Sequence, residues 1–308
     1  MPVQSEHTRR VLTRSGYRDI LVNPGFRRAQ KPSFGQKRRT SQRAGLTQVA
    51  GGGQSVEARM AGGPAAKASL VSAISGQEER IASSAYGFRE IADDLTSNKI
   101  SLFEAQERSR LTVVEMEGHM AAVEYAAGRI SPEFAAAVSR NHENVREKAV
   151  DSIGYLLDME DSPMTLDGEY SATGFRSTAA EPMYDATRDA ADSLQVAAAQ
   201  EIAAQFLPTA TADVEDAFRN VDLSDPSSVV RYHEAGRELF EVTRSLREME
   251  NDINGNDFHA SQMIWAVGEM DRVLHSGGNR DVAVENLWSA VDSFQGGFGL
   301  LVQNTTGS

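Results

Sequence analysis

The sequence contains no cysteine among its 308 residues. This absence excludes a disulfide framework, a thiolate zinc site, an iron–sulfur cluster and a cysteine nucleophile. It does not fix the compartment, because a cysteine-free protein folds in any redox environment. The chain also lacks a run of about 18 consecutive apolar residues, which a membrane-spanning helix needs. We therefore expect a soluble or peripheral protein, cytoplasmic by default, with a secreted or virion-associated location as the alternatives.

Short motifs of catalysis and phosphate binding are missing as well. The sequence holds no Gly-x-x-x-x-Gly-Lys-Ser/Thr loop, no dinucleotide-binding glycine motif after a strand and no Gly-x-Ser-x-Gly elbow. We therefore predict no catalytic residue, no metal ligand and no cofactor, and we expect a protein that is not an enzyme. Catalytic groups that meet only in space would escape such a search.

The chain does contain enough apolar residues for a packed core. Its positive and negative charges are distributed unevenly along the sequence. Hydrophobic residues make up 40% of the sequence, and the net charge is −13. Of the 31 Lys/Arg and 44 Asp/Glu residues, 13 and 3 fall within residues 1–70, which gives this part a net charge of +10. Residues 71–308 hold the remaining 18 and 41, a net charge of −23. Such a division indicates a tail whose role differs from that of the body.

Residues 1–65 have the composition of a disordered basic arm. Glycines at 51–53 and 62–63 interrupt any regular element, and apolar residues are too sparse to offset the entropy of ordering the chain. A short helix over Thr8–Leu21 could form on a partner. Flexible cations can neutralise phosphates, and interleaved aromatic rings can stack on unpaired bases. We single out as an anion- or partner-binding set Arg9, Arg10, Arg14, Arg18, Arg27, Arg28, Lys31, Lys37, Arg38, Arg39 and Arg43.

Beyond the arm, apolar residues recur at the spacing of amphipathic helices. In the first such segment the intervals are three, four and seven, which is typical of a helix or of a short coiled-coil seam. Gln77 and Ser84 occupy two inward positions, which favours packing in a bundle over a long coiled coil. The apolar positions of this segment are Leu70, Ile74, Ile81, Phe88, Ile91 and Leu95.

Two helix starts are marked by local signals. Ser101 followed by Glu104 is a capping box, and it predicts a helix over Leu102–Ala127. Ser131 before Pro132 predicts the start of another helix, which runs to about residue 158. Five further helices are predicted at 182–207, 212–221, 226–253, 258–274 and 281–294, the first of them stopped by Pro208.

The sequence thus predicts an all-α protein, with a disordered basic arm followed by one elongated helical bundle or two packed helical subdomains. Strand patterns of alternating Val, Ile and Thr are absent, and the high alanine content favours helix. The predicted parts are the arm at 1–65, a three-helix subdomain at 66–158, a linker at 159–181, a second subdomain of four to five helices at 182–295, and a frayed tail at 296–308.

One internal match raises the question of a duplication. Residues 138–147 and 229–238 are identical at six of ten positions, including the dipeptides that begin with His142 and His233. A duplicated helical unit and a chance match are both open. A zinc-protease motif needs a second histidine four residues after the first, and Arg146 and Arg237 stand there instead. We interpret the first segment as a solvated, ion-paired helix face formed by Arg140, Glu143, Arg146 and Glu147.

Other candidate sites are also interpreted as structural. Glu115, Glu117 and His119 have the wrong spacing for a di-iron bundle, and His119 is predicted to pack among methionines. Residues 250–257 resemble the front of a calcium loop, but Ser261 stands where a bidentate Glu is required. A polar turn with Asn256 or Asp257 as N-cap is the better interpretation. Core packing is expected for the tryptophans, with an interface anchor as the alternative, at Trp265 and Trp288.

From these features we expect a non-catalytic scaffold, adaptor or assembly protein that uses its arm for protein docking or targeting. Its partners would be proteins that contact helix faces, and it could form a homo-oligomer. Two alternatives stay open: a secreted helical effector or secretion-control protein whose first residues are the export signal, and a virion or packaging protein that binds nucleic acid through residues 1–65.

Overall fold

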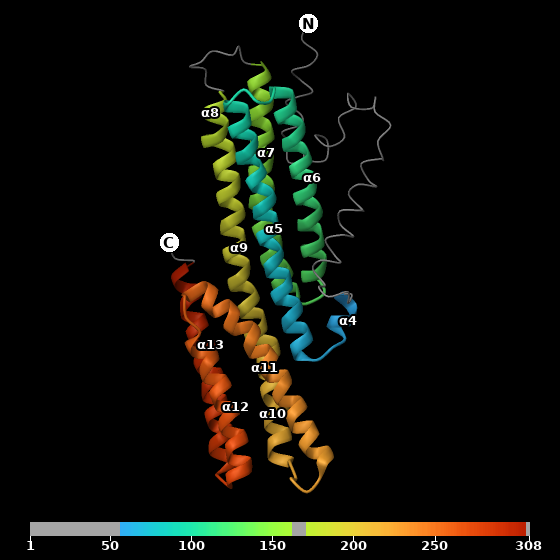
Figure 1. The fold of residues 1–308 in the computed structure, drawn as a ribbon, viewed down its shortest axis with the longest axis vertical. Helices are drawn as coiled ribbons and strands as arrows, with labels where there is room; N and C mark the ends of the chain where they lie inside the picture. The colour runs from blue at the N-terminus through green and yellow to red at the C-terminus, as the bar shows by residue number, and fades with distance from the viewer. Residues whose placement is uncertain (1–55, 162–170, 306–308) are drawn as a thin grey trace. The chain divides into compact units, whose positions relative to one another are not determined.

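The computed structural model describes residues 56–161 and 171–305 (Figure 1). Every regular element within these ranges is helical, which confirms the predicted all-α class. The cations singled out in the arm, from Arg9 to Arg43, lie outside the described residues, as does the predicted Thr8–Leu21 helix. The end of the predicted arm is described, and it is helical: α4 spans Val56–Met60 and α5 begins at Pro64.

The described residues divide into two compact units. Unit 1 comprises those of Gln77–Tyr125 and Val138–Ala191. Unit 2 comprises those of Val49–Gly76, Ala126–Ala137 and Asp192–Ser308. Each unit therefore draws on several helices, whereas the sequence suggested a single division at 159–181. That the predicted subdomains 66–158 and 182–295 are separable stays a prediction.

Unit 1 takes its core from α5 (Pro64–Thr96), α6 (Leu102–Ala127), α7 (Pro132–Asp161) and the helices that follow residue 171. The heptad pattern of α5 predicts its buried positions correctly, and four of them, Ile81, Phe88, Ile91 and Leu95, belong to this core. Burying large apolar side chains stabilises the fold by about 1.5–3 kcal/mol each. The largest side chains of this core include Ile81, Phe88, Met116, Met120, Leu156, Phe175 and Met183.

The predicted helix starts are confirmed by their caps. The Oγ of Ser101 accepts a hydrogen bond from the backbone N–H of Glu104, over 3.2 Å, and α6 has the predicted bounds. The Oγ of Ser131 accepts from the N–H of Phe134, over 3.0 Å, at the start of α7. Each serine satisfies an N–H that has no partner within its own helix.

Two prolines lie inside helical segments, contrary to the prediction that Pro208 ends one. The π-helical segments η2 (Arg176–Ala180) and η3 (Ile202–Phe206) flank α9 (Glu181–Glu201), and each ends two residues before a proline. At both junctions the backbone N–H donates five residues back, from Glu181 and from Leu207. Proline has no N–H to donate and its ring clashes with the carbonyl four residues earlier. The wider π turn accommodates these constraints, so the helix continues where the sequence predicted a break.

The predicted linker is correspondingly shorter. Helix α7 runs to Asp161, and α8 (Ala172–Phe175) leads into the first π segment. The Oγ of Ser171 caps α8 by accepting from the N–H of Gly174, over 3.0 Å. Helix therefore occupies both ends of the 159–180 segment that the sequence predicted as loop.

Unit 2 contains a four-helix arrangement. Helix α10 (Leu207–Asn220) contacts α11 (Pro226–Asn254), α11 contacts α12 (Phe258–Ser276), α12 contacts α13 (Arg280–Thr305), and α13 returns to α10 (Figure 1). The turns after α11 and α12 are made by glycines with positive φ angles, as helix ends commonly are. Short connections of this kind place consecutive helices side by side.

Helix α13 continues to Thr305, beyond the end predicted near residue 294 and through most of the expected tail. Glycine weakens a helix, which is why Gly296 and Gly297 suggested its end. In the structure a Cβ at Gly297 would lie 3.0 Å from the His259 ring, so glycine allows a close approach of α13 to α12. This tertiary contact outweighs the local preference.

Candidate functional site

A polar cluster lies within unit 1 around His142 on α7, and two of its side chains are fully buried. The side chain of His142 is 0% exposed. Its Nε2 lies 2.6 Å from Oε1 of Glu78 on α5, and its Nδ1 lies 3.0 Å from Oε1 of Glu124 on α6. One imidazole thus joins carboxylates from two other helices. Glu78 is itself fully buried, which makes this an ionic contact inside the core.

Arg146, one turn after His142, extends the cluster. Its Nε donates to Oε2 of Glu117 over 3.0 Å, and its Nη2 lies 2.8 Å from Oε1 of Glu124. We call Glu78, His142, Glu124, Arg146 and Glu117 the buried ionic cluster. It contains three carboxylates and two basic groups that come from α5, α6 and α7, so it fixes how these helices face one another.

The environment shifts the pKa values of this cluster. Burial alone would lower the pKa of His142, but the hydrogen bonds and charges of Glu124 and Glu78 outweigh it and raise the pKa above 6.5. Burial would raise the pKa of Glu124, yet the hydrogen bond from His142 and the charge of Arg146 bring it below 4.5. Both shifts favour the charged forms of these groups.

The predicted solvated face of α7 is therefore only partly correct. Arg140, Glu143 and Glu147 are exposed, but Arg146 turns into the cluster together with His142. His233, the counterpart of His142 in the matching segment, is exposed on α11. Of the two histidines in the matched segments, one is thus buried and the other is exposed. The sequence similarity does not extend to the surroundings of these residues.

A second candidate site is the outer face of α12 in unit 2. Phe258 is 59% exposed and Trp265 is 62% exposed. Because they are seven residues apart, they project from the same side of the helix. The expectation of core packing is therefore wrong for Trp265. Trp288 differs: it is half-buried, and its indole N–H donates to Oε2 of Glu215 over 2.7 Å.

The same face of α12 continues into polar residues. Ser261 and Gln262 lie between the two aromatic side chains and are half-buried. One turn beyond Trp265, the carboxylate of Glu269 accepts from Nε and Nη2 of Arg272, over 3.0 and 2.7 Å. We call Phe258, Trp265 and their polar neighbours the α12 aromatic face. An aromatic centre with a polar surround is the usual composition of a protein interface.

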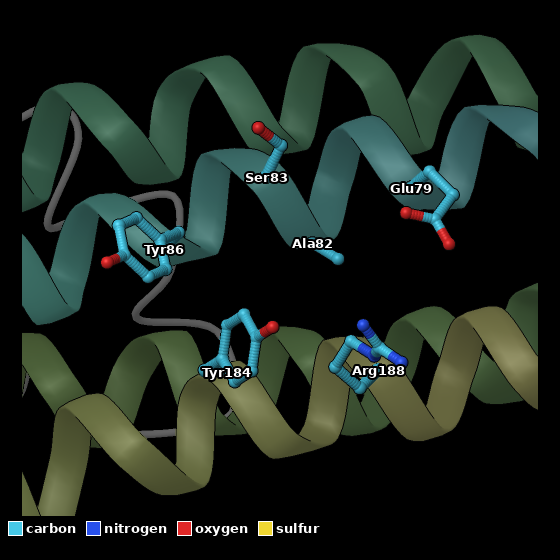
Figure 2. Close-up of a pocket in the computed structure, with 6 residues that line it drawn as sticks. All are labelled: Glu79, Ala82, Ser83, Tyr86, Tyr184 and Arg188. Carbon is cyan, nitrogen blue, oxygen red and sulfur yellow. The ribbon is translucent and has the colours of Figure 1, made fainter.

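A small open groove of about 230 Å³ lies between α5 and α9 in unit 1 (Figure 2). Tyr86 and Tyr184 face one another across it, with their ring centroids 6.2 Å apart and nearly perpendicular. The guanidinium of Arg89 covers the Tyr184 ring at 3.7 Å and pairs with Glu181. These contacts hold the tyrosines by packing within the fold. The groove is lined by Glu79, Ala82, Ser83, Tyr86, Tyr184 and Arg188.

The segment that resembles a calcium loop is a helix connection. Gly255 ends α11 with φ 67°, and Asp257, the residue before α12, pairs with Arg247. The cap of α12 comes from Glu250, whose Oε2 accepts from the N–H of Ala260 over 2.9 Å. The expected polar turn is correct. Of its two predicted caps, Asn256 accepts from the N–H of Phe258 through Oδ1, over 3.3 Å, whereas Asp257 forms no side-chain cap. In residues 56–161 and 171–305, no group of three or more acidic or histidine side chains is arranged to hold a metal ion.

No protein-family model, no curated protein and no solved structure matches the chain. Among the helices that the structure describes, none combines the length and the apolar character needed to cross a membrane.

Proposed function

We propose that this protein is a non-catalytic helical scaffold or adaptor that binds a partner protein through the α12 aromatic face. The exposure of Phe258 and Trp265 on one side of the helix carries the proposal. Tryptophan is among the residues most enriched at the energetic centres of protein interfaces, where its large ring is desolvated in a pocket of the partner. Isolated exposed apolar residues are common, but two large aromatic residues on one helix face form a local apolar surface.

The chemistry of the face defines the partner. Two aromatic anchors about 10 Å apart along a helix require an apolar groove with two adjacent pockets. Residues 71–308 carry a net charge of −23, so basic residues around that groove would speed encounter and disfavour wrong partners. The partner is therefore a protein with an apolar groove and a basic rim.

Affinity capture with the full chain tests this assignment. The test variant is Phe258→Ala/Trp265→Ala, and the matched control is Phe240→Ala, an exposed aromatic on α11. We expect one partner to be retained stoichiometrically by the natural chain and by the control, and to be lost with the test variant. Replacing two interface anchors should weaken binding by at least about a hundredfold, since each anchor contributes about 2 kcal/mol or more. Equal retention by the test variant would remove the α12 aromatic face from the proposal.

The basic arm supports a second candidate function, nucleic-acid binding, through its net charge of +10 over residues 1–70. Fluorescence anisotropy of labelled single-stranded and duplex DNA distinguishes it. The full chain is compared with a chain in which the eleven cations of the arm set are changed to Gln. If the natural chain binds and its log affinity falls linearly with log salt, the arm neutralises phosphates. If neither chain binds at moderate salt, the arm serves protein docking or targeting, as in the scaffold proposal.

A further inference from the structure

The geometry around His142 requires one more proton than a neutral imidazole between two ionised carboxylates would carry. Both ring nitrogens lie within hydrogen-bond distance of a carboxylate oxygen, at 2.6 Å for Glu78 and 3.0 Å for Glu124. An ionised carboxylate only accepts, and a neutral imidazole has only one N–H. The two contacts therefore need either an imidazolium between two carboxylates or a neutral imidazole with one protonated glutamate. Both descriptions contain the same number of protons, so one proton beyond that of a neutral imidazole is shared across these contacts.

The two carboxylates that contact His142 differ in whether they also contact a second cation. On α6, Glu124 also accepts from Nη2 of Arg146, which in turn pairs with Glu117. On α5, Glu78 has no such second cation: its Oε1 contacts His142, and its Oε2 has no hydrogen-bond partner within the described part of the chain. Glu78 is the fully buried carboxylate of the two. Within the described residues, His142 is therefore the hydrogen-bond partner of the Glu78 carboxylate.

We propose that Glu78, His142 and Glu124 form a proton-operated lock that joins α5, α6 and α7 within unit 1. The lock is closed while the shared proton is present and loosens when it is lost at alkaline pH. After proton loss the imidazole can donate to only one carboxylate. Glu124 keeps the Arg146 cation, whereas Glu78 loses its cation and is left as a buried charge that faces a neutral ring with at most one N–H to donate. An unpaired buried charge is strongly destabilising, so the contact between α5 and α7 at Glu78 opens.

The direction of the pH effect follows from linkage. The pKa of His142 is raised above its ordinary value of 6.5, mainly by the opposing carboxylates against the effect of burial. A group with a raised folded-state pKa contributes stability that is fully present below its unfolded pKa and is lost as pH rises through the folded pKa. The lock is therefore closed near pH 6.5, and the contribution of His142 is lost on the alkaline side.

The test measures urea unfolding of the full chain between pH 6 and pH 9. His142→Gln removes the lock, and His233→Gln is the matched control, because His233 occupies the corresponding position of the matching segment and is exposed. In the natural chain and the control, the unfolding equilibrium constant should rise as pH rises. Relative to His142→Gln, this additional rise should reach up to about tenfold per pH unit, because unfolding releases one bound proton. Equal slopes in all three chains would contradict the lock.

A second variant keeps the test decisive if His142→Gln does not fold. Glu78→Gln retains the shape of the side chain and His142 itself, but it removes the charge that requires the proton. This variant should lose the alkaline slope and lower the pH midpoint of the His142 ring protons in NMR spectra. In the natural chain, amide exchange near residues 78 and 142, corrected for its intrinsic pH dependence, should accelerate between pH 6 and pH 9. Unchanged protection there, with an unshifted histidine midpoint, would overturn the proposal.

Discussion

Glu250 and His259 connect the end of α11 to the start of α12. Oε1 of Glu250 lies 2.7 Å from Nδ1 of His259 and also accepts from the His259 backbone N–H, over 3.2 Å. Glu250 is fully buried, and its second oxygen accepts from the next N–H of the same turn. A carboxylate from the preceding helix thus satisfies the first turn of α12, where a negative charge is also favoured by the helix dipole.

This relationship predicts that Glu250→Ala destabilises unit 2. The substitution leaves the backbone N–H groups of half-buried His259 and buried Ala260 without their acceptor, at a cost of about 2–3 kcal/mol. Urea unfolding measures the change. The control is Glu248→Ala, since Glu248 is exposed and lies 3.9 Å from Arg244, a contact whose loss should cost at most about 0.5 kcal/mol. Equal losses in the two variants would show that the cap contributes nothing.

The two tryptophans should respond differently to the same substitution. Trp288→Phe removes the hydrogen bond to Glu215, and because that carboxylate is partly exposed we expect a loss of about 1 kcal/mol. It should also raise the pKa of Glu215, because the hydrogen bond from Trp288 is the largest single cause that lowers this pKa, ahead of the hydrogen bond from Arg219. Trp265→Phe should change stability by less than about 0.5 kcal/mol, as expected of a surface residue. Thermal unfolding of both variants measures the two losses of stability. A larger loss in Trp265→Phe than in Trp288→Phe would contradict the prediction.

The buried ionic cluster also predicts that the protein loses stability at acid pH. The pKa of Glu124 is held below its ordinary value of 4.5 because the hydrogen bond from His142 and the charge of Arg146 outweigh burial. Such a group contributes stability that is present above pH 4.5 and is lost as pH falls through its folded pKa. Glu124→Gln should therefore flatten the decline of stability below pH 4.5. Glu143→Gln, on the exposed side of α7, serves as the control; a decline that stays equally steep in both variants would exclude Glu124 as its source.

Features that depend on neighbours in sequence could be predicted without the structure. Ser101 and Ser131 mark helix starts because an N-cap acts on backbone groups two or three residues away. The buried positions of α5 follow from their spacing, since one side of a helix is set by its period. These local rules explain why the all-α class and the bounds of α6 agree with expectation.

Features that depend on distant residues were missed. His142 meets partners 18 and 64 residues away in sequence, so its segment looked like a surface ion-pair pattern. The exposure of Trp265 could not be foreseen, because an apolar residue on a helix is compatible with both a core and an interface. Pro208 appeared to end a helix, since no local rule signals the π turn that accommodates it.

Site-specific photo-crosslinking tests the central claim, that the α12 aromatic face binds a partner protein, most directly. A photoreactive phenylalanine analogue is placed at position 265, and in a second full-length chain at position 240 on α11, in cells that produce the protein naturally. The account predicts a single, reproducible crosslinked protein at position 265 and none at position 240. The same adducts at both positions, or none at position 265, would contradict it.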